Sequence, residues 1–196
     1  PAHPSAGNHD NTLANALMYY YGSQNKPFVY RCINRLDRDT TGLTIVAKHA
    51  LAGGILGNAV AKRAIHRTYY AVCSGCTPAC MRISAPIARK DASTIERCVD
   101  FKRGENAVTD FIRIKYNPDN NLSLVKLRLL TGRTHQIRVH MKYIGFPLIG
   151  DFLYNPDYTY ISRQALHSGR LVFTHPVTGQ KMNLISDIPS DMKSLF

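Results

Sequence analysis

Two stretches of alternating residues, joined by a short polar turn, are the strongest indication of fold class in this chain. Residues 108–116 and 122–130 flank the turn sequence NPDNN at 117–121. In the second stretch one face carries Ser123, Val125, Leu127 and Leu129, and the other carries Lys126 and Arg128. A period of two residues is typical of β-strands, and Asn, Pro and Asp favour a tight turn. The pattern therefore predicts an antiparallel hairpin.

The remaining patterns add strands and helices to this hairpin. Further strands are predicted at 28–33, 43–47, 68–72, 170–173 and 181–184, with short strands and loops between 77 and 105. Helices are predicted at 11–21, 48–64 and 131–145, the first capped by Asn11 and the third by Thr134. A chain of 196 residues has the size of one domain. We predict a single α+β domain over residues 1–196, with a mixed, mostly antiparallel sheet flanked by helices.

The charge balance points to a polyanionic partner. The sequence holds 25 Lys and Arg against 13 Asp and Glu, which gives a formal net charge of +12. A charge of this size favours nucleic acid first and an anionic membrane surface second. No apolar run approaches the roughly 18 residues of a membrane-spanning helix, and the polar start at 1–10 does not resemble a signal peptide. We therefore expect neither a secreted nor a membrane-spanning protein. The chain begins with Pro rather than Met, which is compatible with a fragment or a processed form.

The five cysteines raise the question of a metal or redox site, because Cys73 and Cys76 form a C-x-x-C pair. A zinc site would need Cys80 and a fourth ligand, for which Cys98 is the candidate, and the helix that usually follows a redox pair is absent from the pattern. An odd number of cysteines argues against a disulfide framework and fits a reducing cytosol. We predict ordinary thiols, no metal site and a cytoplasmic location.

The densest cluster of charge is NRLDRDTTG at 34–42, where Asp37 and Asp39 alternate with Arg35 and Arg38. Taken by itself, this segment fits a charged loop whose aspartates cap the following turn. A catalytic carboxylate would also need an arginine to keep it ionised and an aromatic wall to hold a substrate ring. The residues alone leave both interpretations open.

Residues of the required kinds occur elsewhere in the sequence. Tyr69 lies in a predicted strand and Arg138 in the predicted helix 131–145, although alone they fit a half-buried strand aromatic and a solvated helix residue. In the helix, His135 lies one turn before Arg138. The helix follows the sequence T-G-R, so backbone amides together with Arg133 are predicted to receive a phosphate.

Four blocks of the sequence carry a resemblance to a known family: NRLDRDTTG (34–42), RTYYAVCSG (67–75), TGRTHQIRVHMKYIGFPLIGD (131–151) and ALHSGRLVFTHPVTG (165–179). In this order they resemble the RluA-type RNA pseudouridine synthases, over nearly the whole chain from about His3 to the end. The resemblance implies the catalytic fold of that family and an isomerase that converts specific uridines to pseudouridine in ribosomal or transfer RNA. It implies neither a metal nor another cofactor.

The resemblance also implies roles for individual residues. Asp37 matches the catalytic aspartate, as nucleophile or base, and Arg138 matches the arginine that pairs with it. Tyr69 matches the active-site tyrosine, and Arg35 the arginine that fills the stack when the target nucleotide is flipped out. Leu166 matches an aliphatic residue under the base. With these we group Arg133 and His135 as residues that bind the RNA substrate.

Two departures from the family pattern affect these expectations. The family usually has His before R-L-D, where this chain has Asn34. An amide replaces only one imidazole hydrogen bond, so activity is expected to survive while an RNA contact there is doubtful. The family's opening strand and any amino-terminal RNA-binding domain are not in this sequence, which predicts an unpaired sheet edge.

Two alternatives remain beside the synthase. One is an RNA-binding protein without activity, since fold and charge would persist in an inert chain. The other is a metal-dependent nuclease that uses Asp37, Asp39 and His135, which a chelator would inhibit. We expect the chain to be a monomer whose partner is RNA.

Overall fold

A seven-stranded sheet organises this protein, whose computed structural model describes residues 9–91 and 95–196. The start of the family resemblance at His3 and most of the polar stretch 1–10 therefore lie outside the described residues. The strands of the sheet are β1 Thr41–Gly42, β2 His66–Ser74, β3 Cys80–Ser84, β6 Val108–Asn117, β7 Leu122–Leu129, β8 Leu166–Thr174 and β9 Lys181–Ile185. β4 Ile87–Arg89 and β5 Arg97–Val99 form a separate two-stranded ribbon. The helices are α1 Leu13–Gly22, α2 Ala50–Ala61, α3 Gln136–Tyr143 and α4 Ser190–Lys193.

The sheet is mixed and mostly antiparallel, as predicted. Its order is β1-β8-β2-β7-β6-β3, with β9 also pairing with β8, and only the β1–β8 pair is parallel. The predicted β6–β7 and β8–β9 hairpins are both present, and β2 extends the strand predicted at 68–72 in both directions. In β7 the face of Ser123, Val125 and Leu127 is buried, in agreement with the alternation. The α+β fold class is therefore confirmed.

Two predicted strands are wrong. Residues 28–33 and 43–47 contain no ladder; they form one isolated bridge between Cys32 and Val46, and the short strand β1 lies just before the second segment. The two segments pair irregularly with each other, through amides of Ile33 and Ala47. Their apolar residues pack in one cluster with α2 and with Leu171 and Phe173 of β8, so apolar sequence with only an irregular partner did not produce a regular strand.

The predicted helices exist, but all three begin later than expected. The first helix is capped by Thr12 instead of Asn11. The Thr12 hydroxyl accepts a hydrogen bond from the Asn15 backbone amide. The third begins at Gln136, not in the T-G-R segment, because His135 adopts a left-handed conformation with φ of 57°. Thr134 therefore does not cap it. None of the helices in the described part of the chain is long and apolar enough to cross a membrane.

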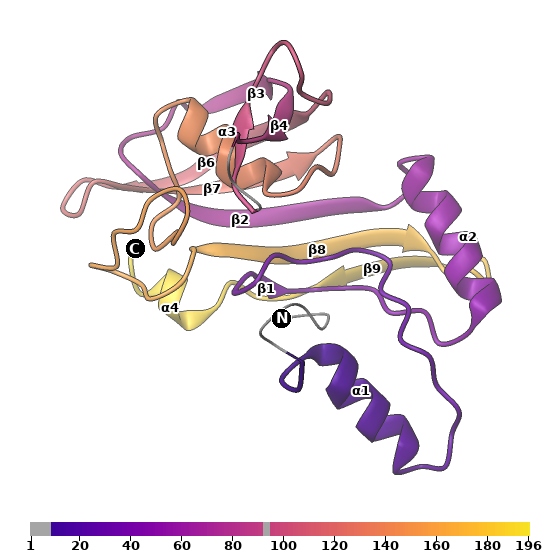
Figure 1. The fold of residues 1–196 in the computed structure, drawn as a ribbon. Helices are drawn as coiled ribbons and strands as arrows, with labels where there is room; N and C mark the ends of the chain where they lie inside the picture. Colours follow the sequence, from indigo (N-terminus) through magenta and orange to yellow (C-terminus); the bar gives the residue numbers. More distant parts are fainter. Residues whose placement is uncertain (1–8, 92–94) are drawn as a thin grey trace.

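The helices divide the core between them. α3 packs Ile137 and Met141 onto the middle of the sheet, against Tyr69 of β2 and Leu127 of β7. α2 packs onto β8 at one end of the sheet. Met192 of α4 packs in a cluster with Val72 of β2 and Leu122 of β7. In Figure 1, α3 lies above β6 and β7, while α1 projects away from the sheet. The loop before β1, the middle of β2 and the start of α3 thus come together beside the central strands.

Candidate active site

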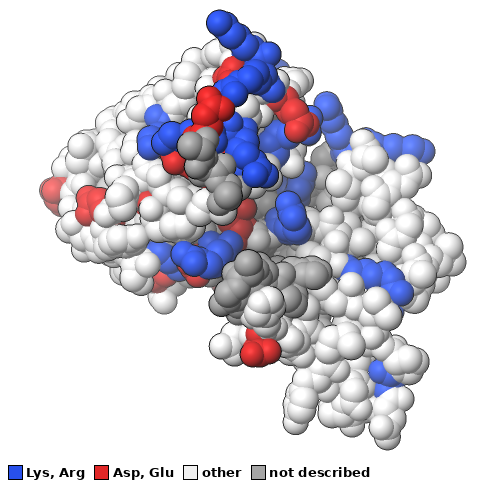
Figure 2. Space-filling view, viewed as in Figure 1, with Lys and Arg blue, Asp and Glu red and all other residues white. Residues whose placement is uncertain are grey.

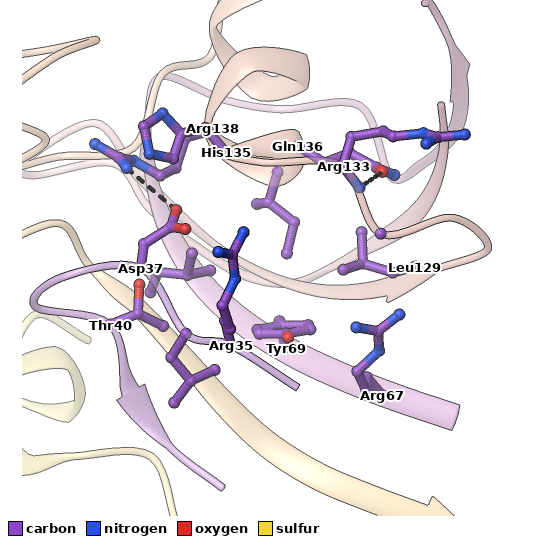
Figure 3. A pocket seen from close by; sticks show the side chains of 14 residues that line it. Arg35, Asp37, Thr40, Arg67, Tyr69, Leu129, Arg133, His135, Gln136 and Arg138 are labelled. Carbon is purple, nitrogen blue, oxygen red and sulfur yellow. Dashed lines mark hydrogen bonds and ion pairs between the residues drawn. The ribbon is translucent and has the colours of Figure 1, made fainter. Parts of the chain in front are cut away.

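The residues predicted to act together line one pocket (Figure 3). Its volume is about 80 Å³. Its walls come from the loop before β1, from β2, from the end of β7, from the start of α3 and from the start of β8. All seven predicted site residues are among those that line it: Arg35, Asp37, Tyr69, Arg133, His135, Arg138 and Leu166. Tertiary contacts therefore join residues far apart in the sequence, such as Asp37 and Arg138, which are 101 positions apart.

Arg138 is buried and fully engaged, not solvated as a helix position alone would suggest. Its side chain is 1% exposed and lies between two carboxylates. Nε and Nη2 each donate to an oxygen of Asp151 at 2.7 Å, and Nη1 donates to Oδ2 of Asp37 at 3.1 Å. Burial opposes the charge, but the hydrogen bonds and charges of Asp151 and Asp37 outweigh it and raise the pKa of Arg138. The arginine is permanently charged and held in a fixed orientation.

Asp151 is a residue that the sequence analysis missed. It is completely buried and also accepts hydrogen bonds from the amides of Leu153 and Tyr154 through Oδ1. Its position at the end of the block 131–151 was the only signal in the sequence. Asp151 occupies two of the three donor groups of Arg138, so Asp37 receives a single hydrogen bond. Within the described residues Oδ1 of Asp37 accepts no hydrogen bond, and the side chain of Asp37 is 26% exposed toward the pocket.

Tyr69 forms the apolar wall of the pocket. Its ring comes from β2 and is 5% exposed. Burial raises the pKa of Tyr69; the negative charge of Asp37 adds to this rise and the positive charge of Arg67 opposes it. The phenol is therefore protonated at neutral pH and presents a flat, neutral surface to the pocket. This arrangement suits a planar ring.

The segment before α3 is fixed by a side chain instead of a helix cap. Oε1 of Gln136 accepts hydrogen bonds from the Thr131 hydroxyl at 2.8 Å and from the Arg133 amide at 2.9 Å. Nε2 of Gln136 donates to Thr109 Oγ1 and to Val108 O in β6. The Arg133 amide is thus already used within the protein, and of the predicted phosphate-binding groups this one is not free. The guanidinium of Arg133 contacts Glu105 at the rim.

His135 lines the pocket in its neutral form. Its Nδ1 lies 2.9 Å from the hydroxyl of Tyr154. That hydroxyl accepts a hydrogen bond from the Arg97 amide, so its own proton is directed to His135 Nδ1. Burial lowers the pKa of His135 and raises the pKa of Tyr154 to about 12. Both effects favour an uncharged imidazole with its proton on Nε2.

The loop that carries Asp37 is anchored on both sides. Asn34 is 4% exposed, and its Oδ1 accepts a hydrogen bond from the Ile45 amide at 2.8 Å. Asn34, which stands in the position of the family's histidine, thus forms a hydrogen bond with the loop backbone and is buried away from the surface where RNA would bind. Beyond Asp37, the buried amide of Gln164 donates to Arg38 O and to Thr40 Oγ1. Arg35 is exposed and points into the middle of the pocket in Figure 3.

The geometry does not favour the nuclease alternative. Asp39 pairs with Arg38 at 3.3 Å on the surface and does not line the pocket beside Asp37. Over residues 9–91 and 95–196, no three His, Cys, Asp or Glu side chains are grouped so that they could hold a metal ion. Of the C-x-x-C pair, Cys73 is buried in the core, where burial raises its pKa, and Cys76 is exposed.

Comparison with known proteins agrees with this geometry. A family model described as RNA pseudouridylate synthase matches residues 1–143. The chain belongs to this family. The matched residues include the loop of Asp37, the strand of Tyr69 and the helix of Arg138.

Two relatives in this family have identical residues at more than a third of the aligned positions. The "Uncharacterized RNA pseudouridine synthase YhcT" of Bacillus subtilis (strain 168) is 39% identical over 194 residues, which cover 98% of this chain and 64% of that protein. The "Ribosomal large subunit pseudouridine synthase D" of Zymomonas mobilis is 38% identical over 211 residues, which cover 99% of this chain and 65% of that protein. The chain therefore spans slightly less than two thirds of the length of these relatives.

Solved structures show the same fold. "Human RNA Pseudouridylate Synthase Domain Containing 1" superimposes with a TM-score of 0.77 at 26% identity, over 91% of this chain and 74% of that chain. "Human RNA Pseudouridylate Synthase Domain Containing 4" superimposes with a TM-score of 0.71 at 21% identity, over 92% of this chain and 78% of that chain. The second match, at lower identity, is evidence of fold alone.

Proposed function

We propose that this protein is an RNA pseudouridine synthase, an isomerase that converts specific uridines of RNA to pseudouridine. Membership of the family supports this activity. The observation that carries it is the pocket in which Asp37, held by Arg138 on one oxygen, faces the ring of Tyr69. The reaction breaks the N1–C1′ bond, turns the uracil, forms the C5–C1′ bond and releases the C5 proton to solvent, while N1 gains a proton.

Each pocket residue has a proposed part in this reaction. Asp37 attacks the sugar or removes a sugar proton, and its Oδ1 has no competing protein donor among the described residues. Arg138 keeps the carboxylate ionised. The detached uracil turns between Tyr69 and Leu166, where it stays bound by stacking and apolar contact. Because the phenol of Tyr69 is protonated in the free site, it accepts the C5 proton only after its own proton has passed to N1 of the detached uracil.

Entry of the uridine requires base flipping. Extrusion of a base costs about a few kcal/mol, which contacts to phosphates offset. Arg35 points into the pocket and must leave it when a nucleotide enters; we propose that it then fills the gap in the RNA stack. Arg133 and His135 line the same entrance, where they would contact the flipped nucleotide.

The substrate and setting are part of the proposal. Two relatives above are named as an RNA pseudouridine synthase and a ribosomal large subunit pseudouridine synthase, which favours ribosomal RNA over transfer RNA. The cysteines of the described chain are free thiols, which fits the cytoplasm. We propose that the protein acts there as a monomer, without a metal or another cofactor.

Tritium release tests the activity. RNA labelled with tritium at uridine C5 is incubated with the parent protein, with Asp37→Asn and with Asp39→Asn. We expect release by the parent and by Asp39→Asn, whose carboxylate pairs with Arg38 outside the pocket. Asp37→Asn should release no more than a sample without protein while binding RNA as tightly as the parent.

The outcomes separate the alternatives. Tight RNA binding without release by any variant would favour the non-enzymatic RNA-binding protein. Release that Asp37→Asn leaves intact would refute the assignment of Asp37. Release that a chelator abolishes would favour metal-dependent chemistry.

A further inference from the structure

We infer that a groove beside the pocket, lined by four arginines, holds the phosphates of the RNA strand that runs out from the flipped uridine. This inference rests on the proposed function, because it extends the same site. We call the surface the arginine groove. Its arginines are Arg63, Arg67, Arg128 and Arg133, and His66 also lines it.

The arginine groove is continuous with the pocket. It has a volume of about 460 Å³ and lies between the end of α2, the start of β2 and the segment after β7. Arg67, Leu129, Gly132 and Arg133 line both the groove and the pocket. A strand whose nucleotide enters the pocket can therefore run directly over this shared wall into the groove. Figure 2 shows Lys and Arg side chains along the hollow that separates the α2 end from the part holding β3–β5.

The charge of the groove is of one sign. Its lining contains no Asp or Glu. Over the described residues, Arg63, Arg67 and Arg128 form no ion pair with a carboxylate. The residue opposite Arg128 in β6 is Asp110, which is held instead by Arg82 with contacts of 2.6 and 2.8 Å. These arginines are therefore available to an external anion.

Arg67 adds a more specific indication. Its Nε is buried and has no hydrogen-bond partner within the described residues. A buried donor of this kind costs free energy unless a ligand accepts a hydrogen bond from it. Its guanidinium lies against Gly132, where a Cβ would come within 3.0 Å of Nη2. Glycine at this position leaves room for the guanidinium at the border between pocket and groove, where the phosphate next to the flipped nucleotide would lie.

A second basic groove is a weaker candidate for the same part. It meets the pocket at Gly132 and Arg133, and it is lined by Arg89, Arg97 and Arg103. Two of its cations are already paired with carboxylates: Arg103 pairs with Asp91 and Asp100, and Arg133 pairs with Glu105, which is itself part of the lining. A phosphate there would compete with these carboxylates, whereas in the arginine groove Arg133 alone is paired among the described residues and the lining contains no carboxylate.

The test uses arginines that do not line the pocket. Arg63→Gln/Arg128→Gln removes two exposed charges from the groove without altering the residues around Asp37. Lys115→Gln/Lys193→Gln is the matched control, since both lysines are exposed and lie outside the groove, Lys115 near the turn at the other end of β6. Arg63→Lys/Arg128→Lys keeps the charge and serves as the rescue. A thermal melt of each variant verifies folding.

Binding of a fluorescent oligouridine about 12 nucleotides long is measured over a series of salt concentrations. Each phosphate contact on a single strand contributes about 0.7 to the slope of log K against log salt. We expect the Gln variant of the groove to lower this slope by about 1.4 and to weaken binding about tenfold or more at low salt. The control and the Lys variant should keep the parent slope. In tritium release, the groove variant should raise KM and leave kcat unchanged.

Equal slopes for the groove variant and the control would overturn the inference, and so would a loss of kcat with unchanged KM. Failure of the proposed function is distinguishable from this result. In that case the parent would release no tritium, while the groove variant would still bind oligouridine with the reduced slope.

Discussion

At the residue scale, the orientation of Arg138 decides how much of Asp37 is free to react. A guanidinium can hold one carboxylate by two hydrogen bonds. Here that bidentate contact is made with Asp151, and Asp37 receives only Nη1. If Arg138 made this bidentate contact with Asp37, both oxygens of the proposed nucleophile would be occupied. Asp151 is therefore a positioning residue that acts through Arg138.

Asp151→Asn tests this role. The asparagine side chain keeps an oxygen that accepts hydrogen bonds from the backbone amides of Leu153 and Tyr154. Its NH₂ group, however, faces an N–H donor of Arg138 and cannot accept a hydrogen bond from it. We expect kcat for tritium release to fall about 100-fold, because a small misplacement of reacting groups costs about that much. KM and RNA affinity should not change, whereas a general loss of folded protein would reduce binding capacity as well. A fall in kcat/KM that arises from KM alone would contradict the positioning role.

At the element scale, the loop of Asp37 is held by a two-residue strand. β1 pairs in parallel with His167 and Ser168 of β8, and it begins four residues after Asp37. Gly42 has φ of 103°, and a Cβ there would lie 2.3 Å from the backbone oxygen of Ser168. Only glycine allows this close approach of the loop to β8. The position of Asp37 thus depends on a residue with no side chain.

Gly42→Ala should therefore disturb both stability and activity. We expect the free energy of unfolding to fall by about 2–4 kcal/mol, from backbone strain and the clash with β8, and tritium release to fall with it. The matched control is Gly54→Ala in α2, where a Cβ meets nothing within 4 Å. That change should stabilise the protein by up to about 1 kcal/mol, since alanine favours a helix. Urea unfolding of both variants measures the difference, and a neutral Gly42→Ala would refute the argument.

At the scale of the whole molecule, three histidines tie separate parts of the chain together. His140 of α3 donates from Nε2 to Ala85 O and bonds Thr109 through Nδ1. His167 of β8 bonds Thr41 Oγ1 and Ser186 O, and His135 bonds Tyr154. Burial is the main cause of a lowered pKa in all three. The fold therefore prefers neutral imidazoles at these junctions.

This preference makes stability depend on pH. The pKa values of these histidines in the folded state are below the ordinary value of 6.5. As the pH falls below 6.5, the unfolded chain therefore binds more protons than the folded chain. Stability should be full above that value and should decline below it, by at most about 1.4 kcal/mol per pH unit for each histidine. Urea unfolding at about pH 7.5 and pH 5.5 measures the decline. His140→Gln, which keeps one donor and one acceptor, should reduce it; an unchanged decline in this variant would contradict the role of His140.

The α+β class, the two hairpins and the family were predictable from the amino-acid sequence, because alternation, turn residues and ordered motifs are local properties. The sequence also identified the residues of the pocket, although only through the family resemblance. Its errors lie where local signals competed. Residues 28–33 and 43–47 have strand-like sequences but pair with each other only irregularly, through one isolated bridge. Thr134 has the sequence of a helix cap but precedes His135, whose backbone is in the left-handed conformation.

Which charged side chains lie next to each other depends on the folded chain and could not be predicted from the sequence. A helix arginine such as Arg138 is ordinarily solvated, and its burial between Asp37 and Asp151 depends on three segments that the sheet brings together. The same holds for the arginine groove, where Arg63, Arg67 and Arg128 come from α2's end, β2 and β7. Charge in a sequence is only a sum, whereas the fold sets the distances, and electrostatic interaction depends on distance and burial.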